Sequence, residues 1–184
     1  MQLETERLLL REFVDADWEA VAAYQQEERY WRYYERPQTG GAGRRELVRA
    51  FVAQQAQQPR RGYQLAIILK EQQRLIGNAG VRIRRLVDFG SPEASFEADI
   101  GYELDPAYWG RGYATEAARR LVEFAFRDLG VHRLWAYVLV ENEPSWRVLE
   151  RLGFRREGHL RENEWMQGRY WDTYIYGLLA GQWK

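Results

Sequence analysis

A glycine-rich segment in the second half of the sequence has the residue types of a phosphate-binding turn. It reads Tyr108-Trp109-Gly110-Arg111-Gly112-Tyr113-Ala114-Thr115-Glu116-Ala117 and joins an alternating apolar strand to a helical pattern. The first amides of a helix lack partners within the helix and, together with the helix dipole, attract phosphate groups. Gly110 and Gly112 let the backbone approach a pyrophosphate closely, and Arg111 adds charge at the rim. The segment predicts a phosphate-bearing cofactor, with an ordinary strand-to-helix turn as the alternative.

The elements that must position this turn are predicted by hydrophobic periodicity. Ser95–Leu104 alternates as a half-buried strand does, and from Ala114 to Leu129 the apolar residues recur at helical spacing before Gly130. Further strands are predicted at Leu3–Leu10, Tyr63–Leu69, Leu75–Ile83, Leu134–Val140, Phe154–Gly158 and Arg169–Leu178. Helices are predicted directly after Asp15, which should cap the first of them, around Leu47–Val52 and over Pro144–Leu152. The connections include a turn at Lys70–Arg74, a chain break at Pro37 and Gly40-Gly41, and a loop at Leu86–Ala94. The whole chain is expected to form one α/β domain.

Composition narrows the classes of function. Lys plus Arg and Asp plus Glu number 27 each, so the formal net charge is zero, which argues against a nucleic-acid binder driven by bulk charge. The absence of cysteine excludes disulfides, cysteine-ligated zinc and an acyl group carried on a thiol of the enzyme. The two histidines, His132 and His159, are far apart, so no metal site is expected. With no membrane-length apolar run and a charged N-terminus, we expect a soluble, cytoplasmic protein without a membrane partner.

Four segments together resemble the GNAT N-acetyltransferases, and in particular the RimJ/RimL-type subfamily, which acetylates protein N-termini. Trp109-Gly110-Arg111-Gly112-Tyr113-Ala114 is similar to the family's acyl-CoA pyrophosphate motif Q/R-x-x-G-x-G/A, with Trp109 in place of Gln or Arg. The other three are Leu3–Arg11, which resembles T-x-R-L-x-L-R, Asn142–Phe154, which resembles N-x-x-S…LGF, and Gly168–Asp172, which resembles G-x-y-x-D. The resemblance therefore spans nearly the whole chain.

The resemblance implies a fold and a cofactor. The fold is α/β (α+β): a single GNAT domain over residues 1–184, with a central mixed, mostly antiparallel twisted sheet of about seven strands flanked by about four helices. The cofactor is acetyl-CoA, used as a co-substrate, without a metal. The residues implied to bind it are Tyr102, Glu103 and Leu104 through the strand backbone, Trp109, Gly110, Arg111, Gly112, Tyr113, Ala114 and Thr115 in the turn, and Asn142 and Ser145.

Acetylation of an amine places demands on the groups around the thioester. An α-amine with a pKa of about 8, or a lysine amine at about 10.4, is mostly charged at neutral pH, so a proton must leave it. Without cysteine, direct attack in a ternary complex is the simplest route, and the resemblance implies the same. It also places Ser145 near the thioester sulfur, as a hydrogen-bond donor to the leaving thiolate, and Asn142 on the pantetheine arm. The alternatives are a helix-start serine and a helix cap.

Two carboxylates are candidates for removing the amine proton. Glu164 adjoins Trp165, and burial beside an aromatic side chain would raise the pKa of the glutamate into a useful range. The resemblance associates a carboxylate near this position with proton removal. Asp99, where the subfamily often has Glu before I-G-Y, is the alternative base. For both residues, a solvated strand carboxylate is the competing interpretation.

The acceptor amine is the least determined part of the prediction. Tyr30, Trp31 and Tyr34 lie in an unusually aromatic stretch and are candidate walls of the acceptor pocket, because the family often frames its substrate with the segment after the first helix. Core packing or a homodimer contact is the alternative. The acceptor stays open between a protein N-terminal α-amine and a small-molecule amine such as an antibiotic or a polyamine. A non-catalytic acyl-CoA-binding sensor is a third hypothesis.

Overall fold

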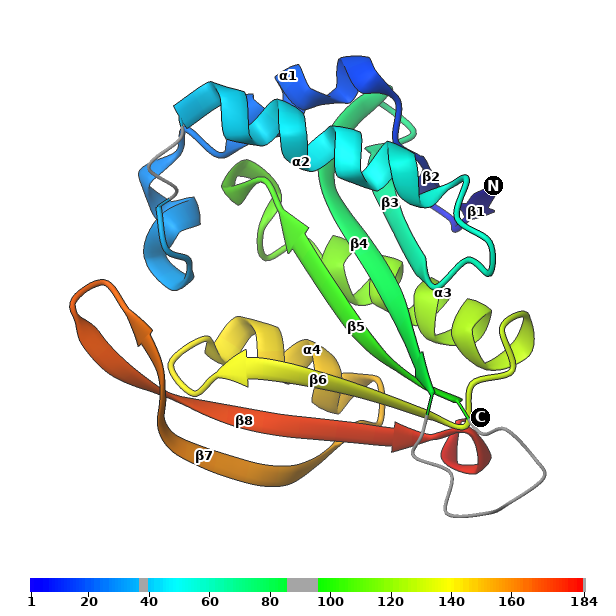
Figure 1. Ribbon diagram of the computed structural model, residues 1–184, viewed down its shortest axis with the longest axis vertical. Coiled ribbons are helices and arrows are strands. Elements are labelled where there is room, and N and C mark those ends of the chain that lie inside the picture. Colours follow the sequence, from blue (N-terminus) through cyan, green and yellow to red (C-terminus); the bar gives the residue numbers. More distant parts are fainter. Residues whose placement is uncertain (37–39, 86–95, 184) are drawn as a thin grey trace. The chain divides into compact units, whose positions relative to one another are not determined.

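The central sheet is mixed and mostly antiparallel, as predicted. The computed structural model describes residues 1–36, 40–85 and 96–183. The strands are Gln2–Glu4 (β1), Leu8–Glu12 (β2), Gly62–Leu69 (β3), Arg74–Arg85 (β4), Phe96–Leu104 (β5), Arg133–Leu139 (β6), Arg155–Met166 (β7) and Arg169–Leu179 (β8). In the described residues they are hydrogen-bonded in the order β1-β2-β3-β4-β5-β6-β8-β7 (Figure 1). The pair β5–β6 is parallel, whereas β1–β2, β2–β3, β6–β8 and β7–β8 are antiparallel.

The sheet has eight strands rather than about seven, because the predicted strand Leu3–Leu10 folds as two. β1 and β2 form a hairpin in which Leu3 pairs with Leu10. Thr5 closes the turn between them: its amide donates to the Leu8 carbonyl at 3.0 Å, and the Leu8 amide donates to Thr5 Oγ1 at 2.9 Å. A threonine hydroxyl that bonds nearby backbone in this way favours a turn over a continuous strand.

The helices lie close to where periodicity placed them. In the described residues the α-helices are Trp18–Tyr24 (α1), Gly40–Gln54 (α2), Tyr113–Arg127 (α3) and Glu143–Arg151 (α4), and the 3-10 turns are Asp15–Asp17 (η1), Glu28–Tyr33 (η2), Pro106–Tyr108 (η3) and Ala180–Gln182 (η4). None of these helices combines the length and the apolar character needed to cross a bilayer.

Two local predictions near these helices are wrong. Asp15 begins η1 instead of capping α1, and the carboxylate of Asp17 accepts the Val14 amide at 2.8 Å. The Gly40-Gly41 pair begins α2 instead of breaking the chain, because a helix can start on residues that lack side chains when its later turns are well packed. The break predicted at Pro37 and the loop predicted at Leu86–Ala94 lie outside the described residues.

The chain divides into two compact units. Unit 1 comprises Met1–Gly80 and Gly101–Arg120, and unit 2 comprises Val81–Ile100 and Leu121–Lys184. Along the chain, β4, β5 and α3 each continue from one unit into the other. The expectation of a single domain over residues 1–184 stays a prediction.

One core cluster of unit 1 joins residues of α1 and α2 to residues of β3 and β4. α1 and α2 run side by side (Figure 1). Val21 of α1 and Val48 of α2 are fully buried, and the rings of Phe13 and Phe51 pack with centroids 5.1 Å apart. Full burial of such side chains stabilises a fold by about 1.5–3 kcal/mol each. The other buried members of this cluster are Tyr24, Tyr30, Trp31, Ala66, Ile68 and Leu75.

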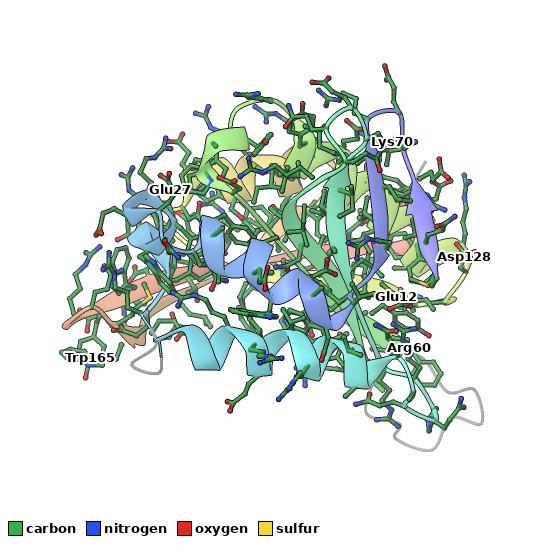
Figure 2. All side chains as sticks on the ribbon, turned by 90° about the horizontal axis from the view of Figure 1, so that it is seen from above. Glu12, Glu27, Arg60, Lys70, Asp128 and Trp165 are labelled. Atoms are coloured by element: carbon green, nitrogen blue, oxygen red, sulfur yellow. The ribbon has the colours of Figure 1, made fainter. Side chains whose placement is uncertain are left out.

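A forked ion pair links the segment before β3 to the end of β2. Arg60, just before β3, reaches the Glu12 carboxylate of β2 with both terminal nitrogens, at 2.8 and 3.1 Å (Figure 2). Both side chains are largely buried. Because two parallel hydrogen bonds fix the guanidinium plane, this pair holds the segment just before β3 against the end of β2.

Unit 2 contains a long hairpin made by β7 and β8 (Figure 1). Leu149 and Leu152, from and just after α4, are buried, as are Tyr176 and Leu178 of β8. Near the end of the hairpin Trp165 is 64% exposed (Figure 2). The register of the hairpin carries two irregularities, the second between Leu160 and Glu164, and the candidate base Glu164 lies at that point.

Candidate functional site

The glycine-rich turn has the backbone conformation that its sequence predicts. β5 ends at Leu104, η3 follows, and α3 begins at Tyr113. Gly110 and Gly112 have φ values of +75° and +82°, a region that other residues rarely adopt. A Cβ added at Gly110 would meet nothing within 4 Å, and one at Gly112 would meet only Arg7 Nη2 at 3.4 Å. Glycine is therefore needed at these positions for the backbone conformation of the turn, and not because neighbouring atoms leave no room for a side chain.

Side chains before the turn hold it in place. Asp105 Oδ1 accepts the Ala107 amide at 2.9 Å, and the Asp105 amide donates to the Ile76 carbonyl of β4 at 2.8 Å. Trp109, which stands where the family motif has Gln or Arg, is 42% exposed and donates its indole N–H to the Leu104 carbonyl at 2.9 Å. Trp109 thus ties the turn back to the end of β5.

A second network, which sequence reasoning missed, holds the start of α3. The Glu116 carboxylate accepts the Thr5 hydroxyl at 2.6 Å, the Arg7 amide at 2.9 Å and Arg7 Nε at 2.6 Å. Arg7 also donates Nη1 to the Arg111 carbonyl inside the turn at 3.0 Å. Burial by itself would raise the pKa of Glu116, but the hydrogen bonds from Thr5 and Arg7 outweigh it and lower that pKa. All four residues of this network lie in Leu3–Arg11 or in 108–117, the two segments already singled out by their motifs, so their sequence positions were a usable signal.

The amides at the start of α3 face the turn. The first recorded bond within the helix runs from the Glu116 amide to the Gly112 carbonyl at 3.0 Å. Tyr113, Ala114 and Thr115 therefore occupy the positions at which a helix offers its amides to an outside acceptor. The predicted turn residues 109–115 lie together in unit 1, as do Tyr102, Glu103 and Leu104 on the strand that precedes them.

The aromatic stretch proposed for the acceptor also lies in unit 1. Tyr30 and Trp31 are 4% and 8% exposed and belong to the core cluster, whereas Tyr34 is 38% exposed and stacks on Tyr30 with centroids 4.9 Å apart. Trp31 donates Nε1 to the Gln25 carbonyl at 2.7 Å. The packing favours core positions for Tyr30 and Trp31, and Tyr34 keeps the accessibility that a pocket wall needs.

The hydroxyls of two buried tyrosines contact the carboxylate of Glu103, a residue that the sequence analysis named only for its backbone. Tyr24 and Tyr30 both donate to Glu103. Burial, and next the negative charge of Glu103, raise the pKa of both tyrosines, so both keep their protons across the physiological range. Sequence reasoning missed this role because the three residues come from separate elements.

Ser145 and Asn142 lie at the start of α4 in unit 2. Asn142 is the N-cap residue, yet its side chain makes no capping hydrogen bond, and its carbonyl accepts the Ser145 amide at 3.0 Å. Trp146 fixes this helix start by donating Nε1 to the Val140 carbonyl at 3.0 Å. Both Asn142 and Ser145 are half-buried. The Asn142 amide group is thus not engaged in capping, which suits the polar contact predicted for it.

The two candidate bases have different surroundings in unit 2. Asp99 is 3% exposed and pairs with Arg82, whose Nε and Nη2 lie 2.6 and 2.5 Å from Oδ2, and with Arg84 at 3.4 Å. Glu164 is exposed, as is its neighbour Trp165, so the predicted burial of Glu164 beside an aromatic is wrong. The edge position of β7 explains the exposure. Glu164 remains a candidate as a solvated carboxylate, and Asp99 ranks below it because two guanidinium groups occupy its oxygens.

The aspartate of the G-x-y-x-D segment has a structural part in the same hairpin. Asp172 Oδ1 accepts the Glu162 amide at 2.8 Å, and Oδ2 lies 2.6 Å from His159 Nε2. Glu162 has a φ of +51°, at the irregular part of β7. The Glu162 amide and His159 lower the pKa of Asp172. This aspartate therefore stabilises the bend beside Glu164.

Comparisons with known proteins show which family and which fold this chain resembles. Residues 7–155 match the model of the Acetyltransferase (GNAT) domain. The uncharacterized N-acetyltransferase YnaD of Bacillus subtilis (strain 168) is 32% identical over 189 residues, which cover 100% of both chains. Spermidine N(1)-acetyltransferase of Vibrio cholerae serotype O1 is 33% identical over 76 residues, 41% of this chain and 44% of that protein.

A solved structure shows the same fold at lower sequence identity. The structure of RimL, the ribosomal L7/L12 alpha-N-protein acetyltransferase, in complex with coenzyme A has a TM-score of 0.79 to this chain at 20% identity. The similarity covers 97% of this chain and 98% of that one. At this identity the likeness shows a common fold.

Proposed function

The chain belongs to the GNAT acetyltransferase family, and from that premise we propose that it transfers the acetyl group of acetyl-CoA to a primary amine in a ternary complex. The observation that carries the choice of cofactor is the turn at Gly110 and Gly112, whose left-handed glycines lead into the first turn of α3. Such a turn presents backbone amides to a diphosphate without obstruction by side chains.

The cofactor would lie along β5 and the turn that follows it. In this proposal the amides of Tyr113–Thr115 bind the diphosphate, and the exposed guanidinium of Arg111 adds positive charge. The backbone of Tyr102–Leu104 pairs with the pantetheine amides. In support, β5 pairs with β6 over Glu97–Asp99 and continues as a strand to Leu104, and an extended ligand can lie beside such a strand as a further strand does.

The proposed reaction forms one C–N bond and breaks one C–S bond. The neutral amine attacks the thioester carbonyl, the tetrahedral intermediate collapses, and coenzyme A leaves as a thiolate that takes up a proton. The Ser145 hydroxyl donates a hydrogen bond to the departing sulfur. The proton lost by the amine passes to Glu164 or to solvent. Because the sequence contains no cysteine, no acyl-thiol intermediate on the enzyme enters the scheme.

Two classes of acceptor are candidates. A protein N-terminal α-amine is the first, supported by the resemblance of the four quoted segments to the RimJ/RimL-type enzymes. A small-molecule amine is the second, supported by the similarity to a spermidine acetyltransferase and by the carboxylate of Glu103, which accepts the Tyr24 hydroxyl within unit 1 and could attract a cation.

A two-step measurement tests the proposal. Calorimetry should show that the purified protein binds acetyl-CoA, and a free-thiol assay should show release of coenzyme A with at least one amine among N-terminal peptides, aminoglycosides, amino acids and polyamines. The absence of cysteine removes background from such an assay. Failure to bind the cofactor would overturn the whole proposal. Binding without turnover on any amine would instead favour an acyl-CoA sensor.

A further inference from the structure

A half-buried carboxylate, that of Glu103, collects hydrogen bonds from three separate elements of unit 1. The hydroxyl of Tyr24, from α1, donates to Oε1 at 2.6 Å, and the hydroxyl of Tyr30, from η2, donates to Oε2 at 2.6 Å. From β4, Asn78 Nδ2 donates to Oε1 at 2.6 Å. Gln64 in turn fixes the Asn78 amide by donating to its Oδ1 at 2.5 Å. The fold therefore holds this carboxylate in one defined place.

Every recorded partner of Glu103 is neutral. Across residues 1–36, 40–85 and 96–183, no lysine or arginine forms a recorded ion pair with it. The guanidinium of Arg44 reaches the neighbouring Gln25 Oε1 at 3.1 Å instead. A carboxylate drawn partly out of water without a cation is unfavourable unless a cation is supplied from outside.

The carboxylate also has room for one more donor. A carboxylate oxygen can accept two hydrogen bonds. Oε1 receives Tyr24 and Asn78 at 2.6 Å and, in a longer contact of 3.5 Å, Gln25 Nε2, whereas Oε2 receives only Tyr30 among the described residues. Each tyrosine hydroxyl has a single proton and directs it at Glu103, so the carboxylate is the acceptor in every contact. The open position on Oε2 suits an N–H of a positively charged ligand.

We propose that Glu103 is the anchor for a second positively charged group of the acceptor, so that the enzyme selects amines that carry a cation in addition to the reacting nitrogen. This rests on the proposed acetyl transfer, and it narrows the acceptor to cationic amines. The backbone of Tyr102–Leu104, on the same strand, is the proposed pantetheine site. The anchor and the proposed cofactor site therefore use the same stretch of β5. Glu103 determines specificity here and does not remove the proton.

A matched pair of amines tests the anchor. Putrescine carries two amines, and aminobutanol replaces one of them with a neutral hydroxyl at the same chain length. The wild-type kcat/KM should favour putrescine by about tenfold to hundredfold, as expected for a hydrogen bond between charged groups. Glu103→Gln should bring the ratio close to one. Glu46→Gln, which removes an exposed carboxylate of α2, should keep the wild-type ratio.

Two outcomes would overturn the anchor: a wild-type enzyme without preference, or a Glu103→Gln enzyme that keeps it. If the glutamine variant does not fold, Glu103→Asp keeps the charge and withdraws it by one methylene. That variant should shift the preference from putrescine toward the longer cadaverine, and an unchanged length preference would count equally against the proposal.

The failure of acetyl transfer and the failure of the anchor can be told apart. If the wild-type enzyme acetylates neither amine, calorimetric titration of putrescine into the protein still measures the site. Putrescine binding that is lost in Glu103→Gln and kept in Glu46→Gln would support Glu103 as the cation-binding residue and would refute only the proposed acetyl transfer to these amines. Putrescine that binds both variants equally, or does not bind the wild type, would refute the anchor itself.

Discussion

Glu103 and Glu116, both in unit 1, accept nearly the same number of short hydrogen bonds. They differ in that Glu116 forms an ion pair with an arginine, whereas Glu103 forms no ion pair among the described residues. Glu116 accepts the Thr5 hydroxyl at 2.6 Å and is neutralised by Arg7, whose Nη2 lies 2.6 Å from Oε2. Glu103 accepts two tyrosine hydroxyls and the Asn78 amide at 2.6 Å each and the Gln25 amide at 3.5 Å, and no lysine or arginine among the described residues forms an ion pair with it. A carboxylate that is paired with an arginine of the protein stabilises the fold, whereas a carboxylate without a cationic partner can bind a positively charged ligand.

The two glutamates also sit in different kinds of site. Glu116 and Arg7 support the turn whose backbone amides we propose for the diphosphate, so the conformations of Gly110 and Gly112 define that proposed site. The Glu103 group works through side chains from α1, η2 and β4. If both proposals hold, cofactor binding depends on local backbone shape, and acceptor choice depends on tertiary contacts between side chains.

The strongest test of this contrast places a carboxylate in the turn itself. Gly112→Glu should weaken coenzyme A binding by about a hundredfold or more, because a side chain at φ +82° strains the turn and its charge repels the diphosphate. Putrescine binding at Glu103 should persist in this variant. Calorimetry with each ligand measures the two effects separately.

Gly130→Glu is the matched control for this experiment. Gly130 also has a positive φ, +64°, and open space around it, and it lies after α3 instead of before it. It should lose some stability to backbone strain and keep its affinity for coenzyme A. Equal affinity of the Gly112 and Gly130 variants would mean that the turn does not bind the diphosphate.

Removal of Glu116 should cost more stability than neutralisation of Glu103. Glu116→Ala is expected to lower the free energy of unfolding by about 2 kcal/mol, since several hydrogen bonds are lost while the partly exposed Arg7 regains water. Glu103→Gln should cost less, because the Tyr30 hydroxyl can turn to accept from the new amide. Urea denaturation measures both.

Glu123→Ala on the same helix controls for helix propensity. Glu123 pairs with Arg127 one turn later on the surface of α3, and such pairs contribute about 0.5 kcal/mol or less. A loss in Glu116→Ala no larger than in Glu123→Ala would contradict a stabilising role for the network around Glu116.

The difference between the turn and the Glu103 group also explains which features could be predicted from the sequence. The elements and the turn were predictable, because periodicity and glycine spacing are local properties of the chain, whereas the mixed sheet was implied by the resemblance to the GNAT family. The split of Leu3–Leu10 into two strands was missed because the hydroxyl of Thr5 closes a turn inside an apolar stretch. The Glu103 group was invisible, since nothing local marks residues that lie 25 to 79 positions apart as partners.

The start of α4 in unit 2 supplies a smaller test, on turnover alone. Ser145→Ala should lower kcat by about tenfold and leave the affinity for coenzyme A unchanged, because a hydrogen bond to the departing thiolate exists only as the C–S bond breaks. Ser145→Thr keeps the hydroxyl and should recover most of the rate. A parallel loss of affinity and rate in Ser145→Ala would make Ser145 a binding residue.

The smallest expected effect is the pH dependence of the Glu116 pair. Hydrogen bonds from Thr5 and Arg7 lower the pKa of Glu116 below its ordinary value of 4.5, against the effect of burial. A group whose pKa is lowered by folding adds stability above its unfolded value and loses it as the pH falls through the folded value. The stability gap between wild type and Glu116→Gln should therefore be full at about pH 7 and shrink below about pH 4.5, by roughly 1 kcal/mol at most for a partly exposed pair. Urea denaturation of both proteins across that range measures the gap. A gap of constant size would mean that neutral hydrogen bonds, and not the charge of Glu116, hold Arg7, and the contrast with Glu103 would then lose its basis.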